Sequence, residues 1–233
     1  MSTFLFSCCT QKTSSFADPC AEIEDIDNMY YFNHYNNKAA LAECYNKSID
    51  EAIMLCVDWL VLHHDDIRFD TTAITTKIEE LHKNNGFQVI GVAGASRVKI
   101  EEPALWHIMG KKATNMPWDP LHGAVAHGTV NEKYMTAFGV YPHKAVLIDG
   151  VFMAIHRDCF TKIRFDENNP AKFHFYDLHL SLDAALAGFK VGVGDIMITH
   201  TSPGLRDFTP EFLAGQEYFL NKYSEYKGKI IEA

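Results

Sequence analysis

The amino-acid sequence predicts a single α/β domain over residues 1–233, with a central, mostly parallel sheet flanked by helices. Three observations carry this prediction. Short apolar runs alternate with segments in which apolar residues recur every four positions. The order strand–helix–strand–helix–strand near the N-terminus is typical of right-handed crossovers between parallel strands. A length of 233 residues is enough for one large core, or at most two small ones.

The first part of the chain has the clearest alternation. The predicted strands are TFLFSCC (3–9), DWLVLHH (58–64) and FQVIGVAG (87–94), and the predicted helices are residues 38–54 and 71–84. In the first helix Leu41, Tyr45, Ile49 and Ile53 lie four positions apart, which places them on one face. In the second helix Ile74, Ile78 and Leu81 do the same. These faces are expected to cover the sheet.

The middle segment, residues 97–145, is rich in Gly, His, Pro and aromatic residues and has weak periodicity. Its stretch HGAVAHGTVNEKYMTAFGV is compatible with a hairpin. A long irregular insertion is more often a binding surface than a plain linker. The elements expected after it are a strand at 145–156 broken at Asp149-Gly150, a helix at 177–188 ending at Gly188, a strand pair at 190–200 and a C-terminal helix opened by Thr209-Pro210-Glu211.

The composition excludes several classes of protein. Hydrophobic residues make up 47% and charged residues 22%, ordinary values for a soluble globular chain. The net charge of −9 disfavours nucleic acid or an anionic membrane as partner. The stretch MSTFLFSCCTQ does not have the pattern of a signal peptide, and no apolar run approaches the ~20 residues that span a bilayer, so neither element is expected. Six cysteines without a CxxC pair indicate buried thiols in a reducing compartment, so a cytoplasmic location is expected.

Polar residues follow three of the predicted strands. HHDD (63–66), Asp149 and His200 stand at strand ends, where α/β sheets bind their ligands. Asp65 and Asp66 are hard oxygen ligands for Mg²⁺ or Mn²⁺, and His63 with His200 favours Mn²⁺. The alternative is that strand ends carry solvated polar residues in any case. A second apolar strand also ends in a histidine, His200, and this favours the metal site.

Two aspartates have a structural and a catalytic interpretation. Asp177 precedes a helical face, so it is expected as an N-cap worth ~1 kcal/mol, or as a general base, or as both. Asp149 before Gly150 is typical of a turn.

Several segments together resemble the nucleotide-sugar glycosyltransferases of the GT-A (Rossmann-like) fold. NKAALAECYNKSIDEA resembles the helix after their first strand, WLVLHHDD their acidic metal motif, and LIDGVFMAIHR a strand of a small glycosyltransferase-like family. RFDENNPAKFHFYDLHLSLDAALAGFKVGV resembles the catalytic segment of inverting family-two enzymes, and ITH their distal metal-binding histidine. The order of these segments matches the family throughout. Small glycosyltransferase domains of large DNA viruses are similar too.

The resemblance implies a metal-dependent, inverting sugar transfer from a UDP- or GDP-sugar to a glycan or glycoprotein acceptor. Residues 1–96 would bind the nucleotide and residues 97–233 the acceptor. Asp65 and His200 would hold Mn²⁺ or Mg²⁺. Asp177 would be the catalytic base, and Asp149 would lie where donor sugar and acceptor meet. The other implied contacts to the nucleotide-sugar are Ser7, Cys8, Thr10, Asn46, His63, His64, Asp66 and Gly150.

Other interpretations stay open at this point. Trp106 and Trp118 are expected either to stack on the acceptor's sugar rings or to pack in the core. A non-haem Fe(II) dioxygenase would use His63, Asp65 and His200 as its two-histidine, one-carboxylate triad, with Arg206 holding a 2-oxo acid, on an all-β jelly roll. A catalytically inactive sugar-binding domain is a third possibility.

Overall fold

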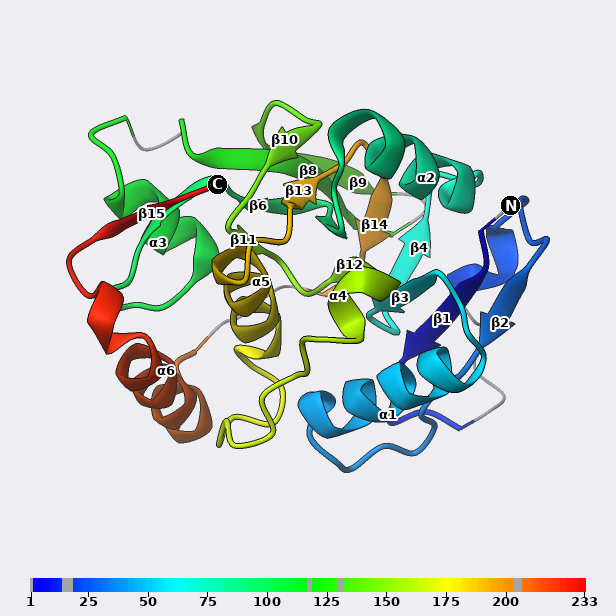
Figure 1. The fold of residues 1–233 in the computed structure, drawn as a ribbon, viewed down its shortest axis with the longest axis horizontal. Coiled ribbons are helices and arrows are strands. Elements are labelled where there is room, and N and C mark those ends of the chain that lie inside the picture. Colours follow the sequence, from blue (N-terminus) through cyan, green and yellow to red (C-terminus); the bar gives the residue numbers. More distant parts are fainter. Residues whose placement is uncertain (1, 14–18, 117–118, 130–131, 203–206) are drawn as a thin grey trace.

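A seven-stranded sheet forms the centre of the computed structural model, which describes residues 2–13, 19–116, 119–129, 132–202 and 207–233 (Figure 1). Its strands, in spatial order, are β10 (His143–Lys144), β13 (Val191–Val193), β5 (Val89–Gly91), β12 (Phe152–His156), β3 (Trp59–His63), β1 (Phe4–Cys8) and β2 (Met29–Tyr31). β1, β2, β3, β5 and β13 run in one direction, and β10 and β12 run against them. The expected mostly parallel sheet is therefore present.

A second sheet carries the segment that the sequence left irregular. Its strands are β11 (Leu147–Ile148), β6 (Ala93–Ala95), β8 (Leu121–Gly128), β14 (Ile198–His200), β4 (Ile67–Phe69) and β9 (Lys133–Gly139). β8 and β9 pair antiparallel, which confirms the expected hairpin. Strands β7 (Arg97–Lys99) and β15 (Ile230–Glu232) form a separate ribbon that ties the C-terminal end to the middle of the chain.

Helices cover the central sheet on both faces. In the described residues they are α1 (Leu41–Met54), α2 (Ile74–Asn85), α3 (Trp106–Lys112), α4 (Arg157–Phe160), α5 (Tyr176–Leu186) and α6 (Pro210–Lys222), with short 3-10 helices at Pro19–Glu22 and Ser224–Tyr226. Figure 1 shows α1 and α5 on one side of the sheet and α2 on the other. None of the helices in the described part is long and apolar enough to cross a membrane.

The alternation of buried residues along β3 explains this sandwich. Trp59 and Val61 pack into the core shared with α2 and the second sheet. Leu60 and Leu62 point the other way, into the core shared with α1, α4 and α5. Because successive strand residues face opposite sides, a strand buried on both faces is apolar throughout. The run WLVL has this pattern, and its residues alternate between the two cores.

The structure corrects the expected topology at three places. The parallel strands β3 and β5 are not neighbours, because β12 lies between them and pairs antiparallel with both. The single strand expected at 87–94 is divided into β5 and β6, which belong to different sheets. The strand pair expected at 190–200 is divided in the same way into β13 and β14. Local patterns detect strands, but the pairing of distant strands decides which sheet they join.

The helix boundaries agree more closely with the sequence. Thr209 caps α6 by accepting a hydrogen bond from the Phe212 N–H at 3.1 Å, with Pro210 in the first turn as expected. Beyond the end of α5, Gly188 has φ +86°, the left-handed conformation that favours glycine after a helix. The expected helix 38–54 begins three residues later, at Leu41.

Further expectations concern thiols, charge and fold class. All six cysteines are free, and four of them are buried, so a reducing compartment stays the prediction.

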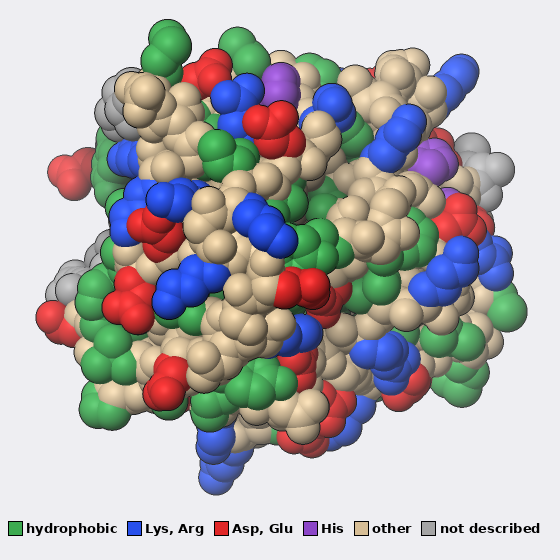
Figure 2. All heavy atoms as spheres, turned by 60° about the vertical axis from the view of Figure 1, so that its left-hand side comes forward, with side chains coloured by type: hydrophobic (Ala, Val, Ile, Leu, Met, Phe, Trp, Pro, Cys, Tyr) green, Lys and Arg blue, Asp and Glu red, His purple; other side chains and the backbone are tan. Residues whose placement is uncertain are grey.

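Figure 2 shows acidic and basic side chains interspersed on one face of the molecule, without segregation by sign. The dioxygenase alternative needs an all-β jelly roll, and the alternation of helices and sheets contradicts it. Trp118 and Arg206 lie outside the described residues.

Candidate active site

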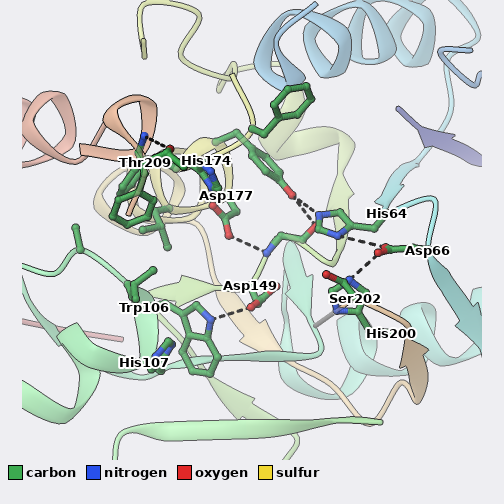
Figure 3. Close-up of a pocket in the computed structure, with 18 of the residues that line it drawn as sticks. His64, Asp66, Trp106, His107, Asp149, His174, Asp177, His200, Ser202 and Thr209 are labelled. Atoms are coloured by element: carbon green, nitrogen blue, oxygen red, sulfur yellow. Dashed lines mark hydrogen bonds and ion pairs between the residues drawn. The ribbon is translucent and has the colours of Figure 1, made fainter. Parts of the chain in front are cut away.

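A pocket of about 750 Å³ opens beyond the end of β3. Figure 3 shows His64, Asp66 and His200 grouped on one side, Trp106 and His174 on the other, and Asp149 and Asp177 between them. The described lining contains four aspartates and neither lysine nor arginine; the aspartates are Asp66, Asp149, Asp177 and Asp207. An anionic ligand would therefore meet like charge here unless a cation accompanied it.

Two strands bring the first group together. β14 pairs antiparallel with β4 so that His200 lies opposite Ile67, next to Asp66 in the chain. The N–H and hydroxyl of Thr201 both donate to the Asp66 carbonyl, at 3.0 and 2.7 Å, which locks the two strand ends together. One ligand atom each from His64, Asp66 and His200 then lies within 4.8 Å of the others. Two imidazoles and a carboxylate suit a divalent transition metal.

Tyr176 sets the proton position on His64. Its hydroxyl donates to the Gly150 carbonyl at 3.0 Å, so its oxygen is left to accept from the His64 Nε2–H at 2.9 Å. Burial, together with the charge of His200, lowers the pKa of His64 and favours its neutral form. Neutral His64 with its proton on Nε2 turns the lone pair of Nδ1 toward Asp66 Oδ1, 3.8 Å away. A metal-binding histidine needs this kind of support on its other nitrogen.

The cluster has unsatisfied buried atoms that fit a metal ion. Asp66 Oδ1 and His200 Nε2 make no hydrogen bond that satisfies them, although they lie 3.2 Å apart as an ion pair. Burial by itself raises the pKa of Asp66, but the neighbouring His200 imidazole, 3.2 Å away, lowers it below the ordinary value. An ionised carboxylate and two histidine nitrogens facing one point form a donor set that a divalent cation would satisfy.

The other half of HHDD points elsewhere. Asp65 Oδ2 accepts from the Thr10 hydroxyl at 2.5 Å and lies 3.3 Å from Lys12 Nζ, so its charge is already compensated. The ring of His63 is buried, 5.5 Å from the ring of Phe69, and its Nε2 is 3.4 Å from Cys20 Sγ. The structure therefore groups Asp66 and His64 with His200, and does not bring Asp65 or His63 into this cluster.

Asp149 faces the pocket from the break between β11 and β12. Its Oδ1 accepts from the Val151 N–H at 3.0 Å, which is the expected turn interaction after Asp-Gly. Its Oδ2 accepts from the Trp106 indole N–H at 2.9 Å (Figure 3). Trp106 is buried and also lines the pocket. Both of its expected roles, packing and pocket lining, are therefore compatible with its position.

Asp177 lies in the first turn of α5 and is not the helix N-cap. Phe175 occupies the cap position with φ +68° and no side-chain cap bond, which corrects the expected capping role. The Asp177 carboxylate instead accepts from the Gly150 N–H at 2.8 Å. Burial and the negative charge of Asp149 raise the pKa of Asp177 to about 7. A carboxylate tuned in this way is suited to exchange protons near neutral pH.

Gly150 is required by this close approach. A Cβ on it would lie 2.6 Å from Tyr176 Cζ and 2.8 Å from Asp177 Cβ. We expect Gly150→Ala to cost about 1–3 kcal/mol of stability through overpacking and to displace both side chains from the pocket. Thermal unfolding and donor binding measure the two effects. Gly188→Ala is the matched control: it meets strain at positive φ but open space, so it should lose stability and keep binding.

Aromatic rings line the pocket opposite the cluster of His64, Asp66 and His200 (Figure 3). The described rings are those of Trp106, Phe138, Phe173, Phe175 and Phe212, with His107 beside Trp106 and His174 beside Phe212. Phe212 comes from α6, whose start is fixed by the Thr209 cap. Flat apolar rings beside two carboxylates can bind the apolar face of a sugar ring while the acids bind its hydroxyls.

Four residues expected near the nucleotide make bonds within the fold, and none of them lines the pocket. The Ser7 hydroxyl donates to the Phe32 carbonyl at 2.5 Å, and Thr10 binds Asp65. Cys8 is buried on β1. Asn46 fastens a distant loop, because its side chain exchanges two hydrogen bonds with the backbone of Phe165. Contact of these residues with a nucleotide stays a prediction.

Sequence reasoning missed two contributors to the site. The first is Tyr176, which lies in the segment that resembles the family's catalytic region and links His64 to Gly150. The second is the choice between the two His-x-Asp pairs of HHDD, which are His63 with Asp65 and His64 with Asp66. Strand alternation places His63 on the face of Trp59 and Val61, but Leu60 and Leu62 face a second core, so alternation alone does not select the pair.

Comparison with known proteins identifies the family. A model described as "Glycosyltransferase like family" matches residues 8–218. The crystal structure of A197 from STIV is similar over 86% of this chain and 86% of its own, at 13% identity and TM-score 0.51. Mannosyltransferase PcManGT from Pyrobaculum calidifontis, in complex with GDP-Man and Mn²⁺, is similar over 97% of this chain and 61% of its own, at 8% identity and TM-score 0.48. No curated protein matches. Because the family match spans most of its length, the chain belongs to the glycosyltransferase-like family and has the GT-A fold.

Proposed function

We propose that this glycosyltransferase is metal-dependent and inverting, and that it moves a sugar from a UDP- or GDP-sugar to a hydroxyl of a glycan or glycoprotein. One observation carries the proposal. A single pocket contains both a three-residue metal set and a buried aspartate whose pKa is raised to about 7. A catalytically inactive binding domain would need neither feature.

The acidic lining supports the requirement for a metal. A nucleoside diphosphate brings negative charge into a pocket with four aspartates and, in its described lining, no Lys or Arg. His64, Asp66 and His200 would hold Mn²⁺ or Mg²⁺, with the imidazoles favouring Mn²⁺. Such an ion supplies a positive charge that offsets the charge on the leaving diphosphate.

Asp177 fits the role of base. The oxygen of the acceptor hydroxyl forms a bond to the anomeric carbon, the bond from that carbon to the diphosphate oxygen breaks, and Asp177 takes the hydroxyl proton. Single displacement of this kind inverts the anomeric centre. General-base catalysis typically contributes ~10²–10⁴-fold. Asp149, held by Trp106 and its own turn, is positioned to bind hydroxyls of the donor sugar or the acceptor.

The experiment that tests this function is a screen of nucleotide-sugars with Mn²⁺, read as thermal shift and as slow donor hydrolysis. A true donor raises the free energy of unfolding by RT ln(1 + [L]/Kd), ~2.7 kcal/mol at a hundredfold excess over Kd. Nucleosides without the diphosphate should give no metal-dependent shift. If no nucleotide-sugar is bound or hydrolysed in the presence of Mn²⁺, the proposed function is wrong.

A further inference from the structure

A second cavity of about 390 Å³ lies beside the active-site pocket. Its described lining consists of Gln11, Asn36, Asn37, Lys38, Lys172 and Phe173. Phe173 also lines the active-site pocket, so one aromatic side chain stands between the two. A single ligand could therefore occupy both cavities.

The charge of this cavity is opposite to that of its neighbour. It contains two lysines, three carboxamides and, among its described lining residues, no acid. Neither Lys38 nor Lys172 forms a side-chain ion pair with any described residue, in a chain with 30 acidic and 21 basic residues. Other lysines do find partners: Lys12 pairs with Asp65, for example. Two unpaired ammonium groups and several amide donors at one cavity suit an anion.

Backbone hydrogen bonds hold the walls in place. The Leu41 N–H donates to the Lys172 carbonyl at 2.9 Å, and the Lys172 N–H donates to Glu211 Oε1 at 2.7 Å. In the segment that supplies Asn36, Asn37 and Lys38, the Asn36 N–H donates to the Lys12 carbonyl at 3.0 Å. Segments from three parts of the chain are thus joined before any ligand arrives. A preformed site loses little conformational entropy on binding.

We propose that this cavity is an anion subsite for a phosphate or carboxylate group of a ligand that extends into the active-site pocket. The inference rests on the proposed function for the identity of that ligand. A metal ion held by His64, Asp66 and His200 would offset the charge of the donor's diphosphate, which leaves the lysines available for another acidic group. That group belongs to the acceptor, as in a sugar phosphate or uronic acid; the alternative source is an oxygen of the nucleotide's own diphosphate that the metal ion would leave uncompensated.

The first experiment needs neither metal nor turnover. In EDTA the acidic active-site pocket has no cation, so saturable binding of inorganic phosphate reports on the lysine cavity. We expect the wild type to bind phosphate and Lys38→Gln/Lys172→Gln to bind it at least tenfold more weakly, by NMR titration. Lys83→Gln, on α2 away from the cavity, is the matched control and should bind as the wild type. No saturable binding by the wild type, or unchanged binding in the double variant, overturns the proposal.

The second experiment identifies the source of the anion. With Mn²⁺ present, the double variant is compared with the wild type for the Kd of UDP and GDP and for KM with paired neutral and acidic acceptors. A nucleotide source predicts a Kd raised at least tenfold. An acceptor source predicts an unchanged Kd and a lost preference for the acidic acceptor. An unchanged Kd together with a retained preference rejects the subsite, whereas failure of wild-type donor hydrolysis would reject the proposed function instead.

Discussion

Asp177→Asn should reduce sugar transfer by at least about a hundredfold while leaving donor binding intact. Asparagine keeps the size of the side chain and an oxygen that can accept from the Gly150 N–H. It removes the carboxylate that would take the acceptor proton. Steady-state kinetics should show the loss in kcat, and nucleoside diphosphate binding should be unchanged. An α-linked donor should give a β-linked product in the wild type, which product NMR can check.

The pH dependence follows from the raised pKa of Asp177. Only the ionised carboxylate accepts a proton, so kcat/KM of the wild type should rise with pH and level off above about 7. In the Asn variant this dependence should disappear from the residual activity.

The same substitution should stabilise the fold. Asp177 releases its proton near 3.8 in the unfolded chain and at about 7 in the folded one. Unfolding therefore releases a proton between these values, and the stability of the wild type falls as pH rises through them. Asparagine cannot ionise, so the advantage of the variant grows from pH 4 to 7 and stays constant above, at roughly 1–3 kcal/mol. Denaturant unfolding at pH 5 and pH 8 measures it.

Asp183→Asn is the matched control, because Asp183 is on the same helix but outside the pocket, paired with Lys222 at 2.9 Å. It should keep full transfer activity and lose at most about 1 kcal/mol of stability. Full activity in Asp177→Asn, or a product of retained configuration, would remove Asp177 from the mechanism.

The fold could be predicted from sequence as far as local patterns reach. The run WLVL predicts a strand buried on both faces, and Thr209-Pro210 predicts the start of α6; both are present. The position of β12 between β3 and β5 could not be predicted, because its pairing partners are about 90 and 65 residues away in sequence and leave no periodic signal. Strand pairing over such separations is a property of the whole core.

Local sequence patterns also predicted part of the site, and contacts between distant segments decide the rest. HHDD, Asp149 and His200 were predicted as chemistry at strand ends, and Asp177 as a cap or base at the start of a helix. His64, Asp66, Asp149, Asp177 and His200 all line one pocket. Which pair within HHDD faces it depends on the turn after β3 and on the pairing of His200 with Ile67. Asn46 has a role that its family-like motif did not predict, because its side chain binds the loop at Phe165 and so serves the fold.

Removal of the metal set should abolish nucleotide binding. We expect EDTA to eliminate binding of UDP or GDP by the wild type, and Asp66→Asn or His200→Ala to weaken Mn²⁺-dependent binding at least about tenfold, which corresponds to 1.4 kcal/mol. The reason is that Asp66 Oδ1 and His200 Nε2 are buried atoms left without hydrogen bonds, and four aspartates would repel an uncompensated diphosphate. Isothermal titration with and without Mn²⁺ measures the loss.

Asp65→Asn tests which of the two His-x-Asp pairs in HHDD holds the metal. Asp65 is the neighbouring aspartate, with a similar chemistry, but it binds Thr10 and Lys12 and does not join His64 and His200. Its substitution should therefore keep Mn²⁺ affinity within about threefold, whereas Asp66→Asn should lose it. Electron paramagnetic resonance of bound Mn²⁺ reports the metal directly, so a nucleotide effect through Thr10 would not be mistaken for a metal effect. If Asp65→Asn lost Mn²⁺ and Asp66→Asn retained it, the metal would belong to His63 and Asp65 instead. If UDP or GDP still bound the wild type in EDTA, no metal would be needed at the site.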